Sequence, residues 1–186
     1  MKRRCAAAAL LILCVFLTCG AGLAPERLIV VDADVQRVYF YREGELIRSW
    51  PCAVGKTATP SPLGVFRING KHANWGTGFG TRFLSIDCPW GKYGIHGTNR
   101  PGSIGWNASH GCIRMLNRDI KELYPLVQIG TKVIIERSSF GNLADGLRVL
   151  RPGDRGSDVY ELQLRLRNAG CYWGFPDGVF GEATRR

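Results

Sequence analysis

Cysteine pairs at metal-binding or redox spacing are missing from this 186-residue chain. None of its seven cysteines forms a Cys-x-x-Cys pair, and there is no dense disulfide pattern. These absences exclude a small scaffold that depends on several disulfides. They leave open a single bridge between Cys52 and Cys88. Beyond the N-terminal segment, no apolar run is long enough to cross a bilayer.

The N-terminal segment has the layout of a secretory signal peptide. Lys2, Arg3 and Arg4 precede an apolar run at residues 6–17, and small residues follow up to Ala24. We therefore expect residues 1–24 to be a signal peptide, with an uncleaved membrane anchor as the alternative. The protein is then exported, and it meets a membrane only through this segment.

Clusters of basic residues are also missing from the rest of the chain. The formal charge is +10, and the signal segment contributes three basic residues and no acidic one. The remaining charge attracts anionic polymers, but its basic residues are scattered. Nucleic acid is therefore not an expected partner of this exported chain.

Short strands separated by Gly- and Pro-rich loops are expected over residues 26–137. Glu43-Gly44 suits a tight hairpin turn. One helix is expected with Asn117 as its cap, shortened or broken at Pro125. This pattern indicates a mainly β fold, either a sandwich or a barrel. The strands are expected at residues 27–33, 37–42, 46–54, 64–69, 82–87, 93–97 and 132–136.

The pattern changes after residue 137. Residues 138–146 have the composition of a linker. Residues 147–186 then predict a small, mostly helical unit, in which apolar residues recur at helical spacing from Val159 to Leu166. Ser157 is expected to cap this helix and Gly170 to end it.

Chemistry is concentrated in the segment from residue 94 to residue 115. His96, His110 and Cys112 lie within seventeen residues of one another. A thiol is a nucleophile only as the thiolate, and a neighbouring imidazole can accept its proton. Gly111 allows a sharp turn, so N–H groups around Cys112 could face a developing oxyanion. Arg114 offers a planar fork that suits a carboxylate.

Other interpretations of these residues exist. His96, His110 and Cys112 are all potential zinc ligands. A lone cysteine is also commonly a buried structural residue. Ser109 is flanked by Asn107 and Gly111, so it lacks the GxSxG elbow of serine hydrolases.

The wider pattern resembles the L,D-transpeptidases of the YkuD family. The resemblance covers residues 26–136, and its motifs are His96-Gly97-Thr98, the run Ser109 to Met115, Gly55 to Gly64 and Gly130 to Ile135. It implies a β-sandwich-like catalytic domain (residues 26–137) that uses no metal or cofactor. It also implies that the nucleophile attacks a peptidoglycan stem peptide, forms a thioester and produces 3→3 cross-links.

The resemblance also assigns roles residue by residue. Cys112 corresponds to the nucleophile and His96 to the general base, with the Gly97 carbonyl orienting the imidazole. His110 and Ser109 would shape the pocket. The N–H groups of Gly111 and Cys112 would form the oxyanion hole. Arg114 would hold a substrate carboxylate. Apart from the resemblance, Trp75 and Trp106 lie in Gly-rich loops that are expected to flank the site, with Trp106 as a wall of the groove; structural packing is the alternative for either residue.

Residues 147–186 resemble a type-1 peptidoglycan-binding domain. Its pattern runs from Leu150 to Thr184, but the usual last helix is incomplete, so we expect a truncated unit. Tyr172, Trp173 and Phe175 are expected in its core rather than stacked on glycan. The expected partners are peptidoglycan stem peptides and glycan. An L,D-carboxypeptidase, an anchoring enzyme and a non-catalytic peptidoglycan-binding protein are the alternatives.

Overall fold

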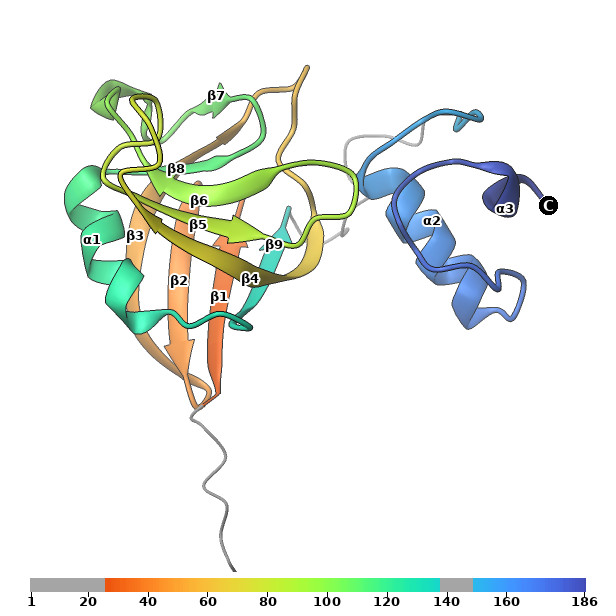
Figure 1. Cartoon of the computed structure of the whole chain (residues 1–186), viewed down its shortest axis with the longest axis horizontal. Helices are drawn as coiled ribbons and strands as arrows, with labels where there is room; N and C mark the ends of the chain where they lie inside the picture. Colours follow the sequence, from red (N-terminus) through yellow and green to blue (C-terminus); the bar gives the residue numbers. More distant parts are fainter. Residues whose placement is uncertain (1–25, 138–148) are drawn as a thin grey trace, which may run out of the picture.

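The structure is a computed structural model that describes residues 26–137 and 149–186 (Figure 1). The expected signal peptide or anchor (residues 1–24) and the expected linker (138–146) lie outside the described residues. The first unit is built mainly of strands, which confirms the expected mainly β fold. Its strands are β1 (Arg27–Asp32), β2 (Arg37–Arg42), β3 (Glu45–Gly55), β4 (Gly64–Ala73), β5 (Arg82–Ile86), β6 (Tyr93–Gly97), β7 (Asn107–Ser109), β8 (Ile113–Met115) and β9 (Lys132–Glu136).

These strands form one sheet that curls back on itself. Its order is β2-β1-β9-β4-β5-β6-β8-β3-β7, and a further pairing of β2 with β3 closes the ring. The length of β3 makes this closure possible. Its first part pairs with β2 from Glu45 to Pro51, while Cys52 and Ala53 pair with β8. The closed sheet leaves few free edges, and it brings β6 and β8, which are distant in the sequence, side by side.

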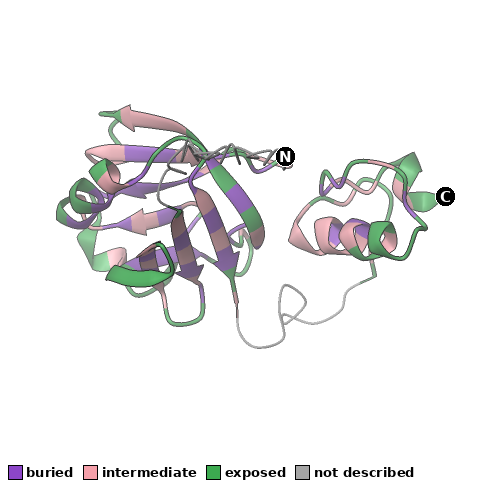
Figure 2. Ribbon diagram, turned by 90° about the horizontal axis from the view of Figure 1, so that it is seen from below, coloured by how far each residue is buried: buried purple, intermediate pink, exposed green. Residues whose placement is uncertain are grey.

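The core lies inside the curled sheet and follows from the alternation of apolar residues along the strands. Ile29 and Val31 of β1, and Val38 and Phe40 of β2, are fully buried, while their neighbours along each strand are only half-buried. Side chains of a strand alternate between its two faces, so every second residue packs inward. Figure 2 shows the resulting buried stripes on the strands of the first unit.

Helix α1 (Asn117–Leu126) closes one side of the first unit, packing Ile120 and Leu123 against β5 and β6. The expectation that Asn117 caps this helix is wrong. Leu116 occupies the N-cap position and forms no side-chain cap bond. The helix continues through Pro125 and ends one residue later, where Lys71 Nζ donates to the carbonyls of Tyr124 and Val127. A cation at this end compensates the unpaired helical carbonyls.

The second unit consists of α2 (Ser157–Asn168), α3 (Glu182–Arg185) and the loop between them. Gln163 of α2 is fully buried and ties these parts together. Its Oε1 accepts from the N–H groups of Asp177 and Gly178 at 2.9 and 2.8 Å, and its Nε2 donates to the Val179 carbonyl and to Thr184 Oγ1 at 3.0 Å each. One amide thus satisfies the polar groups of a core too small to do so by secondary structure alone.

The two units touch at a small interface. The Leu63 N–H donates to Ser157 Oγ at 2.8 Å, and the rings of Trp90 and Tyr160 lie 5.1 Å apart. Ser157 was expected to cap α2, but Gly156 holds the cap position. The Ser157 hydroxyl instead accepts the hydrogen bond from Leu63 of the first unit. The loop that begins at Leu63 and the loop that holds Trp90 are therefore contacted by the second unit.

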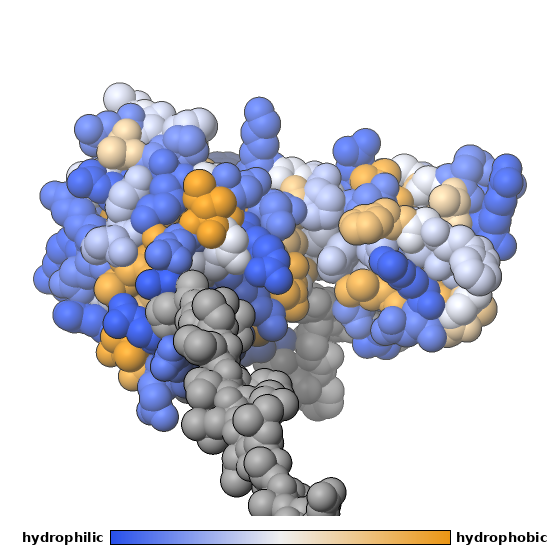
Figure 3. Space-filling view, turned by 60° about the horizontal axis from the view of Figure 1, so that its bottom comes forward, coloured by the Kyte–Doolittle hydropathy of each residue, from blue (hydrophilic) through white to orange (hydrophobic). Residues whose placement is uncertain are grey.

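Two of the three aromatic residues expected in the core of the second unit lie outside it. Tyr172 is buried, whereas Trp173 and Phe175 are 94% and 83% exposed. The buried side chains of this unit instead include Val159, Gln163 and Tyr172, and a unit of this size buries few large rings. Figure 3 shows scattered hydrophobic patches on an otherwise mostly hydrophilic face of the protein.

Two further expectations concern cysteines and membranes. Cys52 and Cys88 are both buried and free, so the bridge that the sequence left open is not formed. In residues 26–137 and 149–186, no helix has the length and apolar character needed to span a membrane.

Candidate active site

The site is built on two neighbouring parallel strands, β6 and β8. In their register Ile95 lies beside Ile113 and His96 beside Arg114. Cys112 directly precedes β8, so the register places it next to Gly94 of β6. Strand pairing between distant segments therefore brings the predicted base and the predicted nucleophile to the same part of the sheet.

His96 is held in a defined orientation inside the protein. Its side chain is only 3% exposed, and Nδ1 lies 2.5 Å from the Gly97 carbonyl oxygen. Because a carbonyl oxygen can only accept, Nδ1 carries the proton in this arrangement, and the lone pair of the neutral ring is on Nε2. This tautomer leaves Nε2 as the ring nitrogen that can accept a proton.

Aromatic rings surround the same imidazole. Phe83 is stacked on it with a centroid distance of 5.6 Å, and the edge of Phe79 contacts it at 5.0 Å. Burial is the main cause that lowers the pKa of His96 to about 4; the Arg114 charge acts in the same direction, and the hydrogen bond with the Gly97 carbonyl opposes them. His96 is therefore a neutral imidazole at neutral pH, able to accept a proton.

Cys112 is a partly buried thiol. Burial raises its pKa, while the hydrogen bond from Gly94 and the positive charge of Arg114 lower it. Arg114 acts on the pKa of both Cys112 and His96, so one cation lies near the two groups. At neutral pH Cys112 is therefore a neutral thiol and His96 a neutral imidazole.

Gly111 occupies a backbone conformation that a larger residue could not share. Its φ is +110°, and a Cβ atom at this position would lie 2.5 Å from Cε1 of Tyr93. Its N–H donates to Oγ of the buried Ser109 at 2.9 Å. In this state the Gly111 N–H is already engaged within the loop, which bears on the predicted oxyanion hole.

The remaining predicted residues differ in their surroundings. Arg114 is half-buried, and its guanidinium donates to the Ala108 carbonyl at 3.4 Å. His110 is exposed, in contrast to His96. Trp106 is 67% exposed, and its carbonyl accepts from the Val54 N–H. His110 and Trp106 therefore lie at the surface, Arg114 is only partly exposed, and the roles of all three stay predictions.

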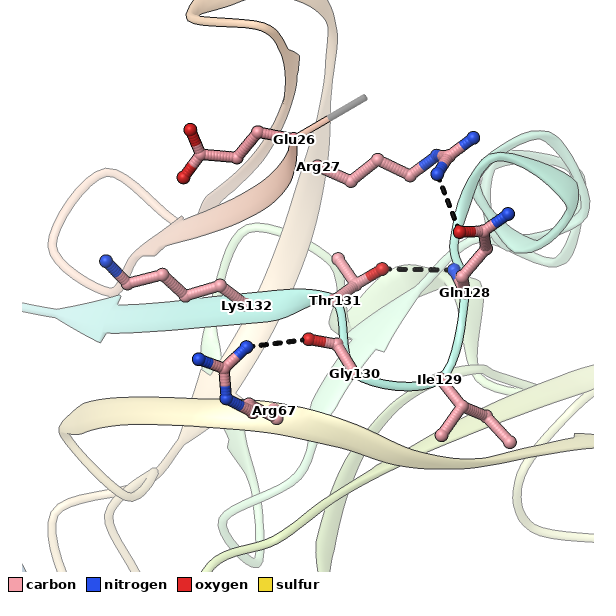
Figure 4. A pocket seen from close by; sticks show the side chains of 8 residues that line it. All are labelled: Glu26, Arg27, Arg67, Gln128, Ile129, Gly130, Thr131 and Lys132. Atoms are coloured by element: carbon pink, nitrogen blue, oxygen red, sulfur yellow. Dashed lines mark hydrogen bonds between the residues drawn. The ribbon is translucent and has the colours of Figure 1, made fainter. Parts of the chain in front are cut away.

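Two hollows in the structure differ in their relation to this site. One, of about 300 Å3, is lined by Trp75, Phe83, Cys88 and Tyr93 among others, and it shares Phe83 and Tyr93 with the surroundings of His96 and Gly111. The other, of about 420 Å3, lies at the beginnings of β1 and β9 and contains none of the predicted site residues (Figure 4). His96, Cys112 and Arg114 do not line the smaller hollow either, and it is connected to the site only through Phe83 and Tyr93.

Several residues that shape the site were not predicted from the sequence. Phe79 and Phe83 contact the imidazole, and Tyr93 packs against Gly111. Asn117 binds the Thr81 N–H before β5 and the Thr98 carbonyl after β6, the histidine strand. Phe83 and Tyr93 lie in segments predicted as strands, but only the pairing of β5 with β6 places Phe83 opposite His96. Local sequence carries no signal for that pairing.

The structure also bears on the zinc alternative. Across residues 26–137 and 149–186, no three or more His, Cys, Asp or Glu side chains gather as metal ligands would. His96, His110 and Cys112 thus do not form a ligand group in this arrangement.

The structure thus places a buried histidine and a partly buried cysteine at neighbouring strands of a closed β-sheet. Residues 26–135 match the YkuD family, the L,D-transpeptidase catalytic domain, and the chain belongs to this family. This result confirms the family resemblance for the first unit.

Individual relatives agree with this assignment. The chain is 44% identical over 107 residues to YkuD of Bacillus licheniformis and 41% identical over 109 residues to YkuD of Bacillus subtilis. These matches cover 58% and 59% of this chain, and 64% and 65% of the two relatives, so the chain spans just under two thirds of their length.

Solved structures show the same fold. The catalytic domain of an Enterococcus faecium L,D-transpeptidase matches with a TM-score of 0.52 and 29% identity, covering 61% of this chain and 99% of that one. The Ldtfm–avibactam carbamoyl enzyme matches with a TM-score of 0.54 and 30% identity, covering 61% of this chain and 49% of that one.

Proposed function

We propose that this protein is an L,D-transpeptidase that uses Cys112 to form a thioester with peptidoglycan stem peptides and then cross-links them. The observation that carries the proposal is the pairing of β6 with β8, which brings Cys112 beside a strand whose His96 has Nδ1 bound to a carbonyl. Family membership supplies the class of reaction, and this arrangement supplies the groups that could perform it.

In the first half-reaction, Cys112 attacks the carbonyl carbon of the third residue of a stem peptide. His96 Nε2 takes the thiol proton as the S–C bond forms. The tetrahedral oxyanion then collapses, and the bond to the D-alanine at position four breaks. His96 returns the proton to the leaving amine, so a thioester and free D-alanine result. No net proton is gained or lost in this step.

In the second half-reaction, an amine on a neighbouring stem attacks the thioester carbonyl. The amine gives a proton to His96, and the Cys112 sulfur leaves as a thiolate that takes this proton back. The product is a new amide, which is a 3→3 cross-link when the acceptor is a third-residue side chain. Water in place of the amine would make the enzyme an L,D-carboxypeptidase, and a protein amine would make it an anchoring enzyme.

The groups around the thiol fit these steps in different ways. The Gly111 N–H already donates to Ser109 Oγ. We therefore expect the Cys112 N–H to bind the oxyanion first, and the Gly111 N–H to join it once its bond to Ser109 breaks. Arg114 is placed to attract a substrate carboxylate. His110, Trp106 and the hollow lined by Phe83 and Tyr93 would hold the rest of the stem peptide.

We also propose that residues 147–186 form a peptidoglycan-binding unit and that the protein acts outside the cytoplasm. The exposed rings of Trp173 and Phe175 offer a flat surface on which sugar rings could stack, and Arg167 lies over the Phe175 ring at 5.7 Å. These residues favour a second candidate function, that of a non-catalytic wall-binding protein.

The decisive experiment compares wild type with Cys112→Ala. Incubation with a defined tetrapeptide and an acceptor should give cross-linked product and free D-alanine only with wild type. Intact-mass measurement with avibactam, which forms the carbamoyl group in the related Ldtfm structure, should show one adduct that is absent from Cys112→Ala. Turnover of the tetrapeptide to tripeptide and D-alanine in the absence of an acceptor amine would indicate an L,D-carboxypeptidase.

The wall-binding alternative makes a different prediction. It requires sedimentation with purified sacculi that survives Cys112→Ala and is lost in a Trp173→Ala, Phe175→Ala double variant, with no adduct on wild type. Wild-type protein that folds but forms neither an adduct nor any tetrapeptide product would refute the transpeptidase proposal.

A further inference from the structure

Asn117 is the first residue of α1, but its side chain points to two other segments of the fold. Its Oδ1 accepts from the Thr81 N–H at 3.0 Å, and its Nδ2 donates to the Thr98 carbonyl at 3.0 Å. Thr81 precedes β5 and Thr98 follows β6. A single amide therefore connects the helix start, the beginning of β5 and the end of β6.

The packing around this amide has no spare room. A Cβ atom built on Gly97 or on Gly80 would lie 2.2 Å from Asn117 Oδ1. Both glycines are thus needed because the amide occupies the space where their side chains would be. Gly97 and Thr98 are buried as well, so the carbonyl that Asn117 binds could not turn freely to water.

The two segments that Asn117 binds also hold two residues that contact the His96 ring. The Gly97 carbonyl accepts from His96 Nδ1, and the peptide that follows it leads directly to the Thr98 carbonyl held by Asn117. The Phe79 ring contacts the His96 ring edge-on with a centroid distance of 5.0 Å, and Phe79 lies two residues before Thr81. Each of these two contacts therefore lies one or two residues from a hydrogen bond made by Asn117.

We propose that Asn117 is a positioning residue for the general base: by fixing the Gly97–Thr98 and Phe79–Thr81 segments, it sets the orientation and tautomer of His96. Asn117 itself touches neither substrate nor thiol in this role. The proposal rests on His96 serving as the base of the proposed function. An imidazole whose partner carbonyl can rotate loses the fixed Nδ1 proton, and small displacements of a catalytic group are costly.

The test uses three variants in the full chain. Asn117→Ala removes both hydrogen bonds. Asn117→Asp keeps an acceptor for the Thr81 N–H but replaces the donor to the Thr98 carbonyl by an oxygen. Asn99→Ala is the matched control, because Asn99 is an exposed asparagine just beyond β6 whose Nδ2 donates to the Thr77 carbonyl at 3.0 Å.

Two measurements distinguish positioning from a structural role. The first is the rate of Cys112 carbamoylation by avibactam as a function of pH. We expect both Asn117 variants to slow it on the order of 10–100-fold, with the acid limb of the profile displaced, and Asn99→Ala to leave it unchanged. The second is the NMR signal of the His96 ring, whose Nδ1 proton should exchange faster or disappear in both variants.

The outcomes separate this proposal from the proposed function. If wild type forms no adduct and no product, the transpeptidase proposal fails, but the ring NMR signal still reports on Asn117. If folded Asn117→Ala and Asn117→Asp keep the wild-type rate, acid limb and ring signal, the positioning role is refuted. Failure of both variants to fold, or equal losses with an unchanged acid limb, would show a purely structural role and would also refute it.

Discussion

The ring of Phe83 lies parallel to the imidazole of His96, with their centroids 5.6 Å apart and an angle of 14° between their planes. This stack is one reason that water cannot reach the imidazole from the β5 side. Burial is in turn the main cause that lowers the pKa of His96 to about 4. The aromatic neighbour thus affects the protonation of the base without touching the thiol.

The first prediction concerns the pH dependence of Cys112 acylation. Because protonation of His96 removes the acceptor, the wild-type rate should fall only as the pH drops through about 4. Phe83→Leu admits water beside the ring, so the charged imidazolium is penalised less and the acid limb should move up by about one pH unit. Avibactam carbamoylation followed by intact mass over a pH series measures both profiles.

The control for this prediction is Phe66→Leu. Phe66 is a buried phenylalanine that contacts Trp90 rather than His96. We expect it to lower the melting temperature without moving the acid limb. An acid limb at the same pH in wild type and Phe83→Leu would show that the stack does not control the histidine.

The strands of the site could be predicted from local sequence, but their pairing could not. The apolar alternation of residues 93–97 and 132–136 predicted β6 and β9 with the bounds that the structure has. Strands β7 and β8 were missed because three residues are too few for any periodicity to be recognised. The site depends on the pairing of β6 with β8, and no local sequence pattern indicates that these two strands lie side by side.

Polar residues at helix starts show a second limit of predicting contacts from the local sequence. Asn117 and Ser157 have the residue type and position of helix caps, and both were predicted to cap. In the structure their side chains bind Thr81, Thr98 and Leu63, which belong to other elements. Capping preference is a local average, and a distant backbone group that needs a partner overrides it.

The second prediction concerns Gly111, the residue before the nucleophile. Alanine at this position would have to adopt φ near +110° and would place its Cβ against the Tyr93 ring. We expect Gly111→Ala to shift the loop, lower stability by about 1–3 kcal/mol and slow Cys112 acylation by about 100-fold. Thermal melting and intact-mass kinetics measure the two effects.

Gly102→Ala is the matched control, since a Cβ at Gly102 meets no atom within 4 Å. This variant should retain both the stability and the acylation rate of wild type. Wild-type acylation in Gly111→Ala would contradict the assignment of a constrained turn to this loop.

The third prediction concerns Gln163, the buried amide of the second unit. Gln163→Leu removes the acceptor for the N–H groups of Asp177 and Gly178 and the donor to the Val179 carbonyl. Buried groups left without partners cost about 1–3 kcal/mol each, more than a unit of this size can lose and stay folded. We therefore expect the second unit to unfold, with a loss of helical circular dichroism and rapid proteolysis beyond residue 148.

The same variant tests whether the two units are separable. The thiol and the imidazole lie in the first unit, so Cys112 acylation should persist in Gln163→Leu, while sedimentation with sacculi should be lost if the second unit binds the wall. Gln128→Leu is the control, because Gln128 is exposed and accepts only a surface bond from Arg27. A second unit that resists protease and melts normally in Gln163→Leu would show that this amide is not what holds it together.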